Sequence, residues 1–150
     1  MGARLNGEPL LLVPDAPEDA HRAALLGPLA EFNRDHAHAG DARPLAVLLR
    51  NGEGATIGGL WGNTLFAWLN IELLFVPAAL RRKSVGREIL VRAEAIAAAR
   101  GCIGACLDTY DFQAPAFYDK LGYTLVGTIK DCPPGGARHF FQKRFVDDIA

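Results

Sequence analysis

The chain has 150 residues, of which 16 are Lys or Arg and 17 are Asp or Glu, so its formal net charge at pH 7 is −1. That length fits one domain over residues 1–150 with a sizeable core, and half of the residues are hydrophobic. The balanced charge argues against a strongly basic nucleic-acid-binding domain and against an acidic disordered chain. Three cysteines are too few for a disulfide framework and no stretch is long enough to span a bilayer, so we expect a cytoplasmic protein.

Strand-like and helical stretches alternate along the chain, and turn residues separate most of them. In chain order the predicted elements are a strand at 8–13, a helix at 17–33, strands at 43–50, 55–62 and 65–76, a helix at 85–100, a strand at 103–110, a helix at 114–121, and strands at 123–129 and 140–146. Gly27-Pro28 predicts a kink in the first helix or its division into two short helices. Asn51-Gly52-Glu53-Gly54 predicts a hairpin turn, and residues 131–139 predict a turn-rich loop before the last strand.

The helix at 85–100 is the clearest element, because its apolar residues follow helical spacing and Ser84 is placed to cap its start. This helix makes a crossover connection between the strands at 65–76 and 103–110, so those two strands should be parallel. The other strands predict antiparallel neighbours. We therefore expect a mixed α/β fold with a predominantly antiparallel central sheet and one parallel strand pair.

Positive charge is concentrated at the start of this helix. Residues 81–100 contain six basic and two acidic residues, and four of the basic ones (Arg81, Arg82, Lys83 and Arg87) precede the first acid. A helix N-terminus offers unpaired N–H groups and the positive end of the helix dipole, which together suit a phosphate. The sequence contains neither the GxxxxGK[ST] loop nor the GxGxxG fingerprint. The segment therefore indicates either a phosphate site of another kind or a solvated basic helix start.

Three segments in a characteristic order carry a family resemblance. They are WLNIELLFV (68–76), RRKSVGREIL (81–90) and FQAPAFYDKLGY (112–123). They resemble, in turn, the fourth strand, the pyrophosphate-binding segment and the Phe-Tyr-x-Lys-x-Gly segment of the GNAT superfamily, the acyl-CoA-dependent N-acetyltransferases. The resemblance implies the GNAT fold over the whole chain, with a splayed parallel strand pair and helices on both faces of the sheet.

The resemblance also implies a binding site for acetyl-CoA as co-substrate, without a metal. Backbone amides between Arg82 and Arg87 would hold the pyrophosphate, and the backbone of the 65–76 strand would pair with the pantetheine arm where that strand splays from its parallel neighbour. The residues assigned to cofactor binding are Leu74, Val76, Arg81, Arg82, Lys83, Ser84, Val85, Gly86, Arg87 and Gln113. Two of them depart from the family pattern: Ser84 replaces a glycine, and Gln113 stands near where many relatives carry Asn.

Two residues are candidates for the chemistry of acetyl transfer. Glu72 lies nine residues before Arg81, where several small-amine acetyltransferases of the family carry a catalytic Glu, and it is the candidate base. Strand alternation places Asn70 on the same face, where it could hold a relaying water. Trp68 could wall the acceptor pocket or fill the core. Tyr118 aligns with the tyrosine that assists the departing thiolate and is the candidate acid. The structural alternatives are a salt bridge for Glu72 and core packing for Tyr118.

These observations predict an N-acetyltransferase that passes acetyl directly from acetyl-CoA to a small-molecule amine. The alternatives left open are a non-catalytic CoA-binding module, a protein or peptide N-acetyltransferase, and a nucleic-acid binder that uses the basic segment. The last alternative is disfavoured, because four charges without interleaved aromatic residues make a small footprint. We expect no nucleic-acid or membrane partner, and a homodimer is left open.

Overall fold

The computed structural model describes residues 3–4, 7, 9–38 and 41–145. The chain divides into two compact units, residues 1–37 and 38–150, and each is described here by itself. The expectation of one domain over residues 1–150 stays a prediction. Among the described residues no helix has the length and apolarity needed to cross a bilayer.

The N-terminal unit contains a short strand pair and one helix. Strands β1 (Ala3–Arg4) and β2 (Leu10–Leu11) pair antiparallel, so the strand expected at 8–13 is shorter than predicted, and residue 8 lies outside the described residues. Helix α1 (Asp19–His36) runs without interruption through Pro28, so the expected division into two helices is wrong. Proline removes one helical N–H donor, and here the residues on both sides continue the helix despite that loss.

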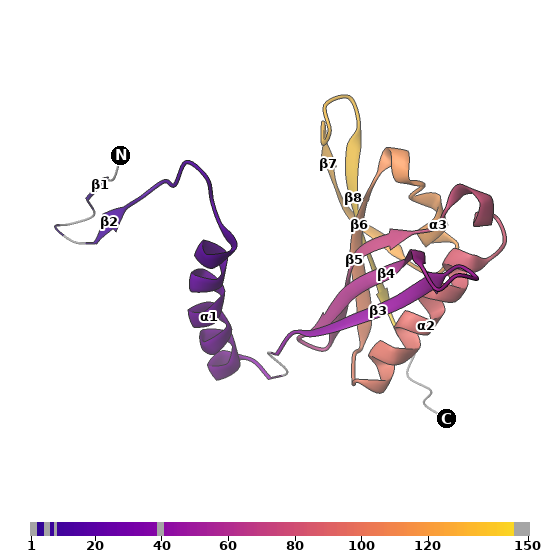
Figure 1. Ribbon diagram of the computed structural model, residues 1–150, viewed down its shortest axis with the longest axis horizontal. Helices are drawn as coiled ribbons and strands as arrows, with labels where there is room; N and C mark the ends of the chain where they lie inside the picture. The colour runs from indigo at the N-terminus through magenta and orange to yellow at the C-terminus, as the bar shows by residue number, and fades with distance from the viewer. Residues whose placement is uncertain (1–2, 5–6, 8, 39–40, 146–150) are drawn as a thin grey trace. The chain divides into compact units, whose positions relative to one another are not determined.

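The second unit is built on a six-stranded sheet with the strand order β3-β4-β5-β6-β8-β7 (Figure 1). Its strands are β3 (Arg43–Arg50), β4 (Thr56–Leu65), β5 (Trp68–Phe75), β6 (Gly104–Tyr110), β7 (Thr124–Lys130) and β8 (Ala137–Arg144). The β5–β6 pair is parallel and every other neighbouring pair is antiparallel, as the crossover helix predicted. The turn at residues 51–54 is also confirmed, because the Asn51 side-chain oxygen accepts the backbone N–H of Ala55 at 2.9 Å.

The hairpin between β4 and β5 differs from the sequence-based expectation. Instead of one strand from 65 to 76, β4 continues to Leu65 and a two-residue turn precedes β5. The turn residues Phe66 and Ala67 have φ values of 53° and 61°, in the left-handed region that usually selects Gly or Asn. The sequence therefore carries no turn signal there. Likewise, β8 begins at Ala137, inside the segment expected to be a loop.

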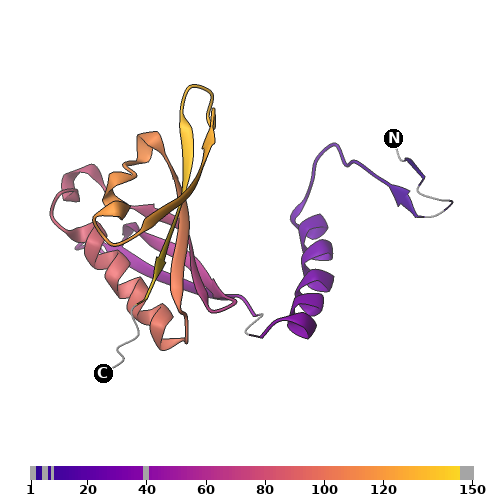
Figure 2. The same cartoon turned by 180° about the vertical axis from the view of Figure 1, so that it is seen from behind.

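Helices flank this sheet, and the longest of them supplies four of the buried core residues. Helix α2 (Val85–Ala99) runs along β3 to β6, and Figure 2 shows it from the reverse side. Its buried residues Ile89, Leu90, Ala93 and Ala97 meet the inward side chains of the strands, such as Leu69 and Leu107. The remaining short helices are η1 (Ala78–Leu80), η2 (Asp111–Gln113) and α3 (Ala116–Asp119). The core fixes the position of α2, and with it the segment that joins β5 to α2.

Candidate active site

The parallel strands β5 and β6 separate toward their C-terminal ends. Their pairing runs only from Trp68 opposite Gly104 to Ile71 opposite Leu107, although β5 continues to Phe75 and β6 to Tyr110. The splay that the sequence predicted is therefore confirmed. Beyond Ile71, β5 is hydrogen-bonded to β4 on one side and open toward β6 on the other. An open strand edge can accept an extended ligand in the manner of an added strand.

Glu72 lies at the point where the two strands part. The β4–β5 register shifts here: Gly62 pairs with Ile71 and Trp61 with Leu73, which leaves Glu72 as the extra residue of a β-bulge. Its side chain is exposed, and its Oε1 accepts a hydrogen bond of 3.0 Å from the Asn63 side-chain amide. No ion pair to Glu72 is found among the described residues, so the salt bridge considered as its structural alternative is absent from them.

The two residues expected to contact the acceptor occupy different parts of β5. Asn70 is half-buried, its amide donates to Asn63 Oδ1 at 3.2 Å, and its oxygen accepts from the Cys106 thiol at 3.1 Å. Trp68 lies at the opposite end of the strand, about 13 Å from Glu72 along the backbone at the usual rise per residue. There its ring is under the Arg144 guanidinium, which lies 5.6 Å from the ring centroid. The structure therefore brings Asn70, but not Trp68, close to the splay.

The basic segment forms a tight turn between η1 and α2. Arg82 and Ser84 both have left-handed φ values, 63° and 61°, and the four side chains from Arg81 to Ser84 are exposed. Arg81 folds back, so that its Nε donates to the Val76 carbonyl at 2.9 Å. Ser84 occupies the N-cap position but makes no capping hydrogen bond with its side chain, so the expected cap is wrong. A side-chain cap needs an extended N-cap backbone, which the left-handed Ser84 does not have.

The missing cap leaves the first-turn amides of α2 available to a ligand. Val85, which is half-buried, begins the helix, and Gly86 follows it at the closest packing point. A Cβ on Gly86 would lie 3.3 Å from the ring of Phe117 and 3.6 Å from a methyl group of Val76. Glycine is therefore needed here because α3 and the end of β5 both approach the start of the helix. The position thus serves the packing of the protein as well as the access of a ligand.

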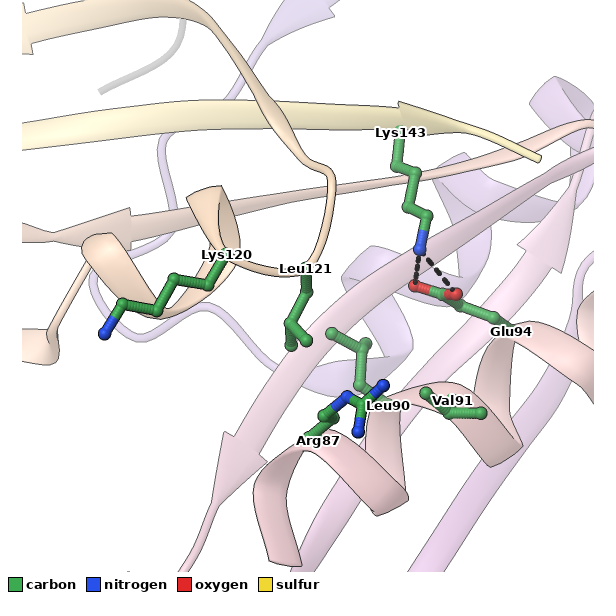
Figure 3. A pocket seen from close by; sticks show the side chains of 7 residues that line it. All are labelled: Arg87, Leu90, Val91, Glu94, Lys120, Leu121 and Lys143. Carbon is green, nitrogen blue, oxygen red and sulfur yellow. Dashed lines mark hydrogen bonds and ion pairs between the residues drawn. The ribbon is translucent and has the colours of Figure 1, made fainter. Parts of the chain in front are cut away.

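A pocket with a volume of about 190 Å³ opens one turn further along α2 (Figure 3). Its lining residues are Arg87, Leu90, Val91, Glu94, Lys120, Leu121 and Lys143. Figure 3 shows Lys143 of β8 and Glu94 of α2 pointing toward each other, and their closest atoms are 3.0 Å apart. Glu94 also accepts a 2.7 Å hydrogen bond from the Tyr123 hydroxyl. Because Lys143 and Glu94 neutralise each other, Arg87 and Lys120 make the rim of the pocket cationic.

Tyr118 and Gln113 lie in the segment that follows β6. Tyr118 is buried, with 8% of its surface exposed, and burial raises its pKa to about 12. Its ring contacts those of Phe117, Tyr123 and Phe141, so the packing considered as its structural alternative is present, and the hydroxyl stays protonated near neutral pH. The Gln113 side-chain oxygen accepts the backbone N–H of Tyr110 at 3.1 Å, which fixes the turn after β6.

Three residues of this region were not singled out by the sequence for any role at the site. Asn63 reaches Glu72 across the β4–β5 pair, and no pattern in the sequence marks it. Cys106 donates to Asn70. Glu94 is the acidic member of the pocket, and its contacts with Lys143 and Tyr123 are made across the fold, where no sequence pattern indicates them. The described residues contain no group of three His, Cys, Asp or Glu that could hold a metal ion.

The comparisons with known proteins agree with this architecture. A family model described as "Acetyltransferase (GNAT) family" matches residues 12–123. An acetyltransferase of Agrobacterium fabrum is 33% identical over 134 residues, which cover 89% of this chain and 98% of that protein. The blasticidin-S acetyltransferase of Streptomyces morookaense is 44% identical over 107 residues, which cover 69% and 79% of the two chains. A crystal structure of an acetyltransferase from Agrobacterium tumefaciens superposes with a TM-score of 0.84 at 32% identity and covers 90% of this chain and 98% of its own.

A sheet with one splayed parallel pair, followed at once by a basic turn and a long helix, is the architecture that the sequence resemblance implied. The chain belongs to the GNAT family of acetyltransferases and has the GNAT fold. It is therefore an acyltransferase enzyme.

Proposed function

We propose that this enzyme transfers the acetyl group of acetyl-CoA directly to an amine of a small molecule. The observation that carries the proposal is the position of Glu72, which is exposed on a β-bulge at the point where β5 leaves β6. A thioester placed in the splay would lie beside this carboxylate. The same strand leads within ten residues to the uncapped start of α2, where the phosphates of a nucleotide could be held.

The chain offers a distinct group for each part of acetyl-CoA. The first-turn amides of α2, from Val85 to Arg87, and the charges of Arg82 and Lys83 suit the pyrophosphate. The cationic rim formed by Arg87 and Lys120 suits the charged nucleotide end. The backbone of Leu74 and Val76 offers hydrogen bonds to the pantetheine amides. Because the Val76 carbonyl accepts from Arg81, a ligand that uses this carbonyl must share it with, or displace, the guanidinium.

The acid–base chemistry follows from the two candidate side chains. An alkyl ammonium must lose a proton before attack, which costs about 4–5 kcal/mol at pH 7, and the Glu72 carboxylate can accept that proton directly or through water. The amine nitrogen then forms a bond to the thioester carbon, the C–S bond breaks, and the nitrogen loses its second proton, which passes through water to the departing CoA thiolate. Tyr118 remains protonated, which suits a donor of a hydrogen bond to the departing sulfur. Gln113 fixes the turn that leads to Tyr118, so its predicted role in cofactor binding is indirect in this proposal.

The acceptor is proposed to be a small cationic amine rather than a protein. The blasticidin-S acetyltransferase, which is 44% identical over 107 residues, is named for a small antibiotic, and that similarity supports this substrate class. Asn70 keeps one amide N–H that none of its observed hydrogen bonds uses, so it remains a predicted contact for the acceptor or for a relaying water. The predicted contact at Trp68 requires an acceptor that extends back along β5.

The test is the release of thiol from acetyl-CoA across a panel of polyamines, amino acids, aminoglycosides, nucleoside antibiotics and lysine peptides. Glu72→Gln should lower kcat by about 10²–10⁴-fold, while stabilisation of the protein by acetyl-CoA in a thermal shift stays near the parent value. Glu88→Gln is the matched control, because it removes an exposed carboxylate that is paired with Arg92 on α2. A loss under threefold in Glu72→Gln would exclude the base role. Binding of acetyl-CoA without turnover of any amine would indicate a binding module, and turnover of peptides alone would indicate a protein acetyltransferase.

A further inference from the structure

A continuous line of side-chain hydrogen bonds crosses three strands and ends on Glu72. The Cys106 thiol donates to Asn70 Oδ1 at 3.1 Å, and Asn70 Nδ2 donates to Asn63 Oδ1 at 3.2 Å. Asn63 Nδ2 then donates to Glu72 Oε1 at 3.0 Å. We refer to these four residues as the amide relay.

The strand register explains why these side chains meet. Asn70 is directly opposite Asn63 on β4 and directly opposite Cys106 on β6, so the three lie at one level of the sheet and on one face. That face is opposite to the core, because the alternating neighbours Leu69 and Ile71 are buried. Glu72 has no residue directly opposite on β4 because of the bulge, and its side chain instead reaches Asn63.

The carboxylate sets the direction of every bond in the amide relay. An ionised carboxylate only accepts, so Asn63 must turn its N–H toward Glu72 and its oxygen toward Asn70. Asn70 must then offer its own N–H to that oxygen, which leaves its oxygen for a donor on β6. Cys106 supplies that donor, and burial raises the pKa of its thiol, which keeps the proton on sulfur. Any reversal of one amide would set two oxygens or two N–H groups against each other.

We propose that Asn63, and through it Asn70 and Cys106, are positioning residues for acetyl transfer. They hold Oε1 of Glu72 in place, so that Oε2 faces the acceptor amine. Asn63 and Asn70 are half-buried, whereas Glu72 is exposed. The two amides are therefore held by their surroundings, while the carboxylate can meet a ligand. This inference rests on the proposed function, because the held carboxylate is useful only if it accepts a proton.

Three charged residues of β6 and β8 on this face, Asp108, Arg138 and Arg144, have partners of their own. Asp108 on β6 accepts a hydrogen bond from Arg138 on β8 at 2.8 Å. Arg138 lies 4.9 Å from the centroid of the Phe140 ring, and Arg144 lies over Trp68 at the far end of β5. The strand β4 contributes the uncharged Asn63. Among the described residues Glu72 is therefore held by the amide relay and not by a paired cation.

Asn63→Leu removes the hydrogen bond from Asn63 to Glu72 with little change in side-chain size. Loss of one charge-assisted hydrogen bond should lower kcat about tenfold and leave the KM for acetyl-CoA unchanged. It should also change the carbon-13 chemical shift of the Glu72 side-chain carboxyl, which NMR measures without any turnover. Gln142→Leu is the matched control, because Gln142 is exposed, pairs with Cys106 in the β6–β8 register and lies outside the relay.

A second pair of variants probes the far end of the relay and covers the case in which Asn63→Leu fails to fold. Cys106→Val removes the donor at similar volume. It should lower kcat by about two- to threefold and change the Glu72 carboxyl signal less than Asn63→Leu does. Cys106→Ser restores a donor and should restore the parent behaviour, which a purely structural role would not predict. An unchanged carboxyl signal of Glu72 in Asn63→Leu or Cys106→Val would overturn the relay. A shifted carboxyl signal with unchanged kcat would overturn the positioning role. A fully active Glu72→Gln would instead refute the proposed function.

Discussion

Tyr118→Phe removes one hydroxyl from the proposed site and leaves the aromatic packing in place. The Tyr118 ring lies 5.1 Å from the centroid of Phe117, 5.8 Å from that of Tyr123 and 5.9 Å from that of Phe141. Phenylalanine can make the same three contacts. The variant should therefore unfold within a few degrees of the parent, so that any loss of activity reports the hydroxyl itself.

The raised pKa of Tyr118 decides how that hydroxyl can help. With a pKa of about 12, against about 8.5 for a thiol, complete transfer of the proton to the departing thiolate is uphill by about 5 kcal/mol. A hydrogen bond to the developing charge has no such cost and contributes about 1.5–3 kcal/mol. The loss of that bond corresponds to a decrease in kcat of about 10- to 150-fold.

The assay is the rate of thiol release at saturating acetyl-CoA from pH 7 to pH 10.5, with one amine and with both proteins. If Tyr118 stays protonated throughout, the two profiles should have the same shape and differ only in height. A parent profile that falls between pH 8 and 9, with the fall abolished in Tyr118→Phe, would show that the tyrosine titrates during catalysis. That outcome, or an unchanged kcat, would refute the reasoning.

The remaining predictions concern packing and stability. Gly86→Val should lower the affinity for acetyl-CoA in a calorimetric titration, because its branched carbons would push Phe117 away from the start of α2. Ala67→Gly should raise the free energy of unfolding by about 0.5–1 kcal/mol in a urea titration, since glycine adopts a left-handed φ at no steric cost. Glu94→Ala should lower the unfolding free energy by about 1–3 kcal/mol, because its half-buried lysine partner loses its counter-charge. Because the Tyr118 pKa is raised in the folded state, its contribution to stability should be complete below about pH 10 and fall by about 3 kcal/mol as the pH rises through 12, as alkaline urea titrations would measure.

The parts of the fold that were predictable are those with a strong local signal. The apolar spacing of α2 and the crossover that it makes predicted the parallel strand pair, and the family resemblance implied that this pair separates. The turn at Phe66-Ala67 was not predictable, because neither residue favours a left-handed backbone and only the pairing of β4 with β5 holds them there. Pro28 led to the opposite error, the expected division of α1 into two helices, because a helix of 18 residues tolerates the loss of one hydrogen bond.

The candidate site shows the same division between local and cross-strand information. Glu72 was identifiable because a charged residue stands in an otherwise apolar strand next to a recognisable segment. Its partner Asn63 was not, because their contact depends on the register between β4 and β5 and on a one-residue bulge. The capping role given to Ser84 failed for a backbone reason, because the turn required a left-handed residue at that position.

The bulge at Glu72 also bears on how enzymes with this architecture can change. A residue that sits outside the regular cross-strand pairs has no steric partner to satisfy, so many side chains can occupy it without disturbing the ladder on either side. The reactive group of this sheet can therefore be exchanged at small cost to folding, whereas the neighbouring Ile71 and Leu69 are held by the core. In this protein the residue from which the chemistry is proposed to arise is therefore one that the cross-strand ladder itself does not hold.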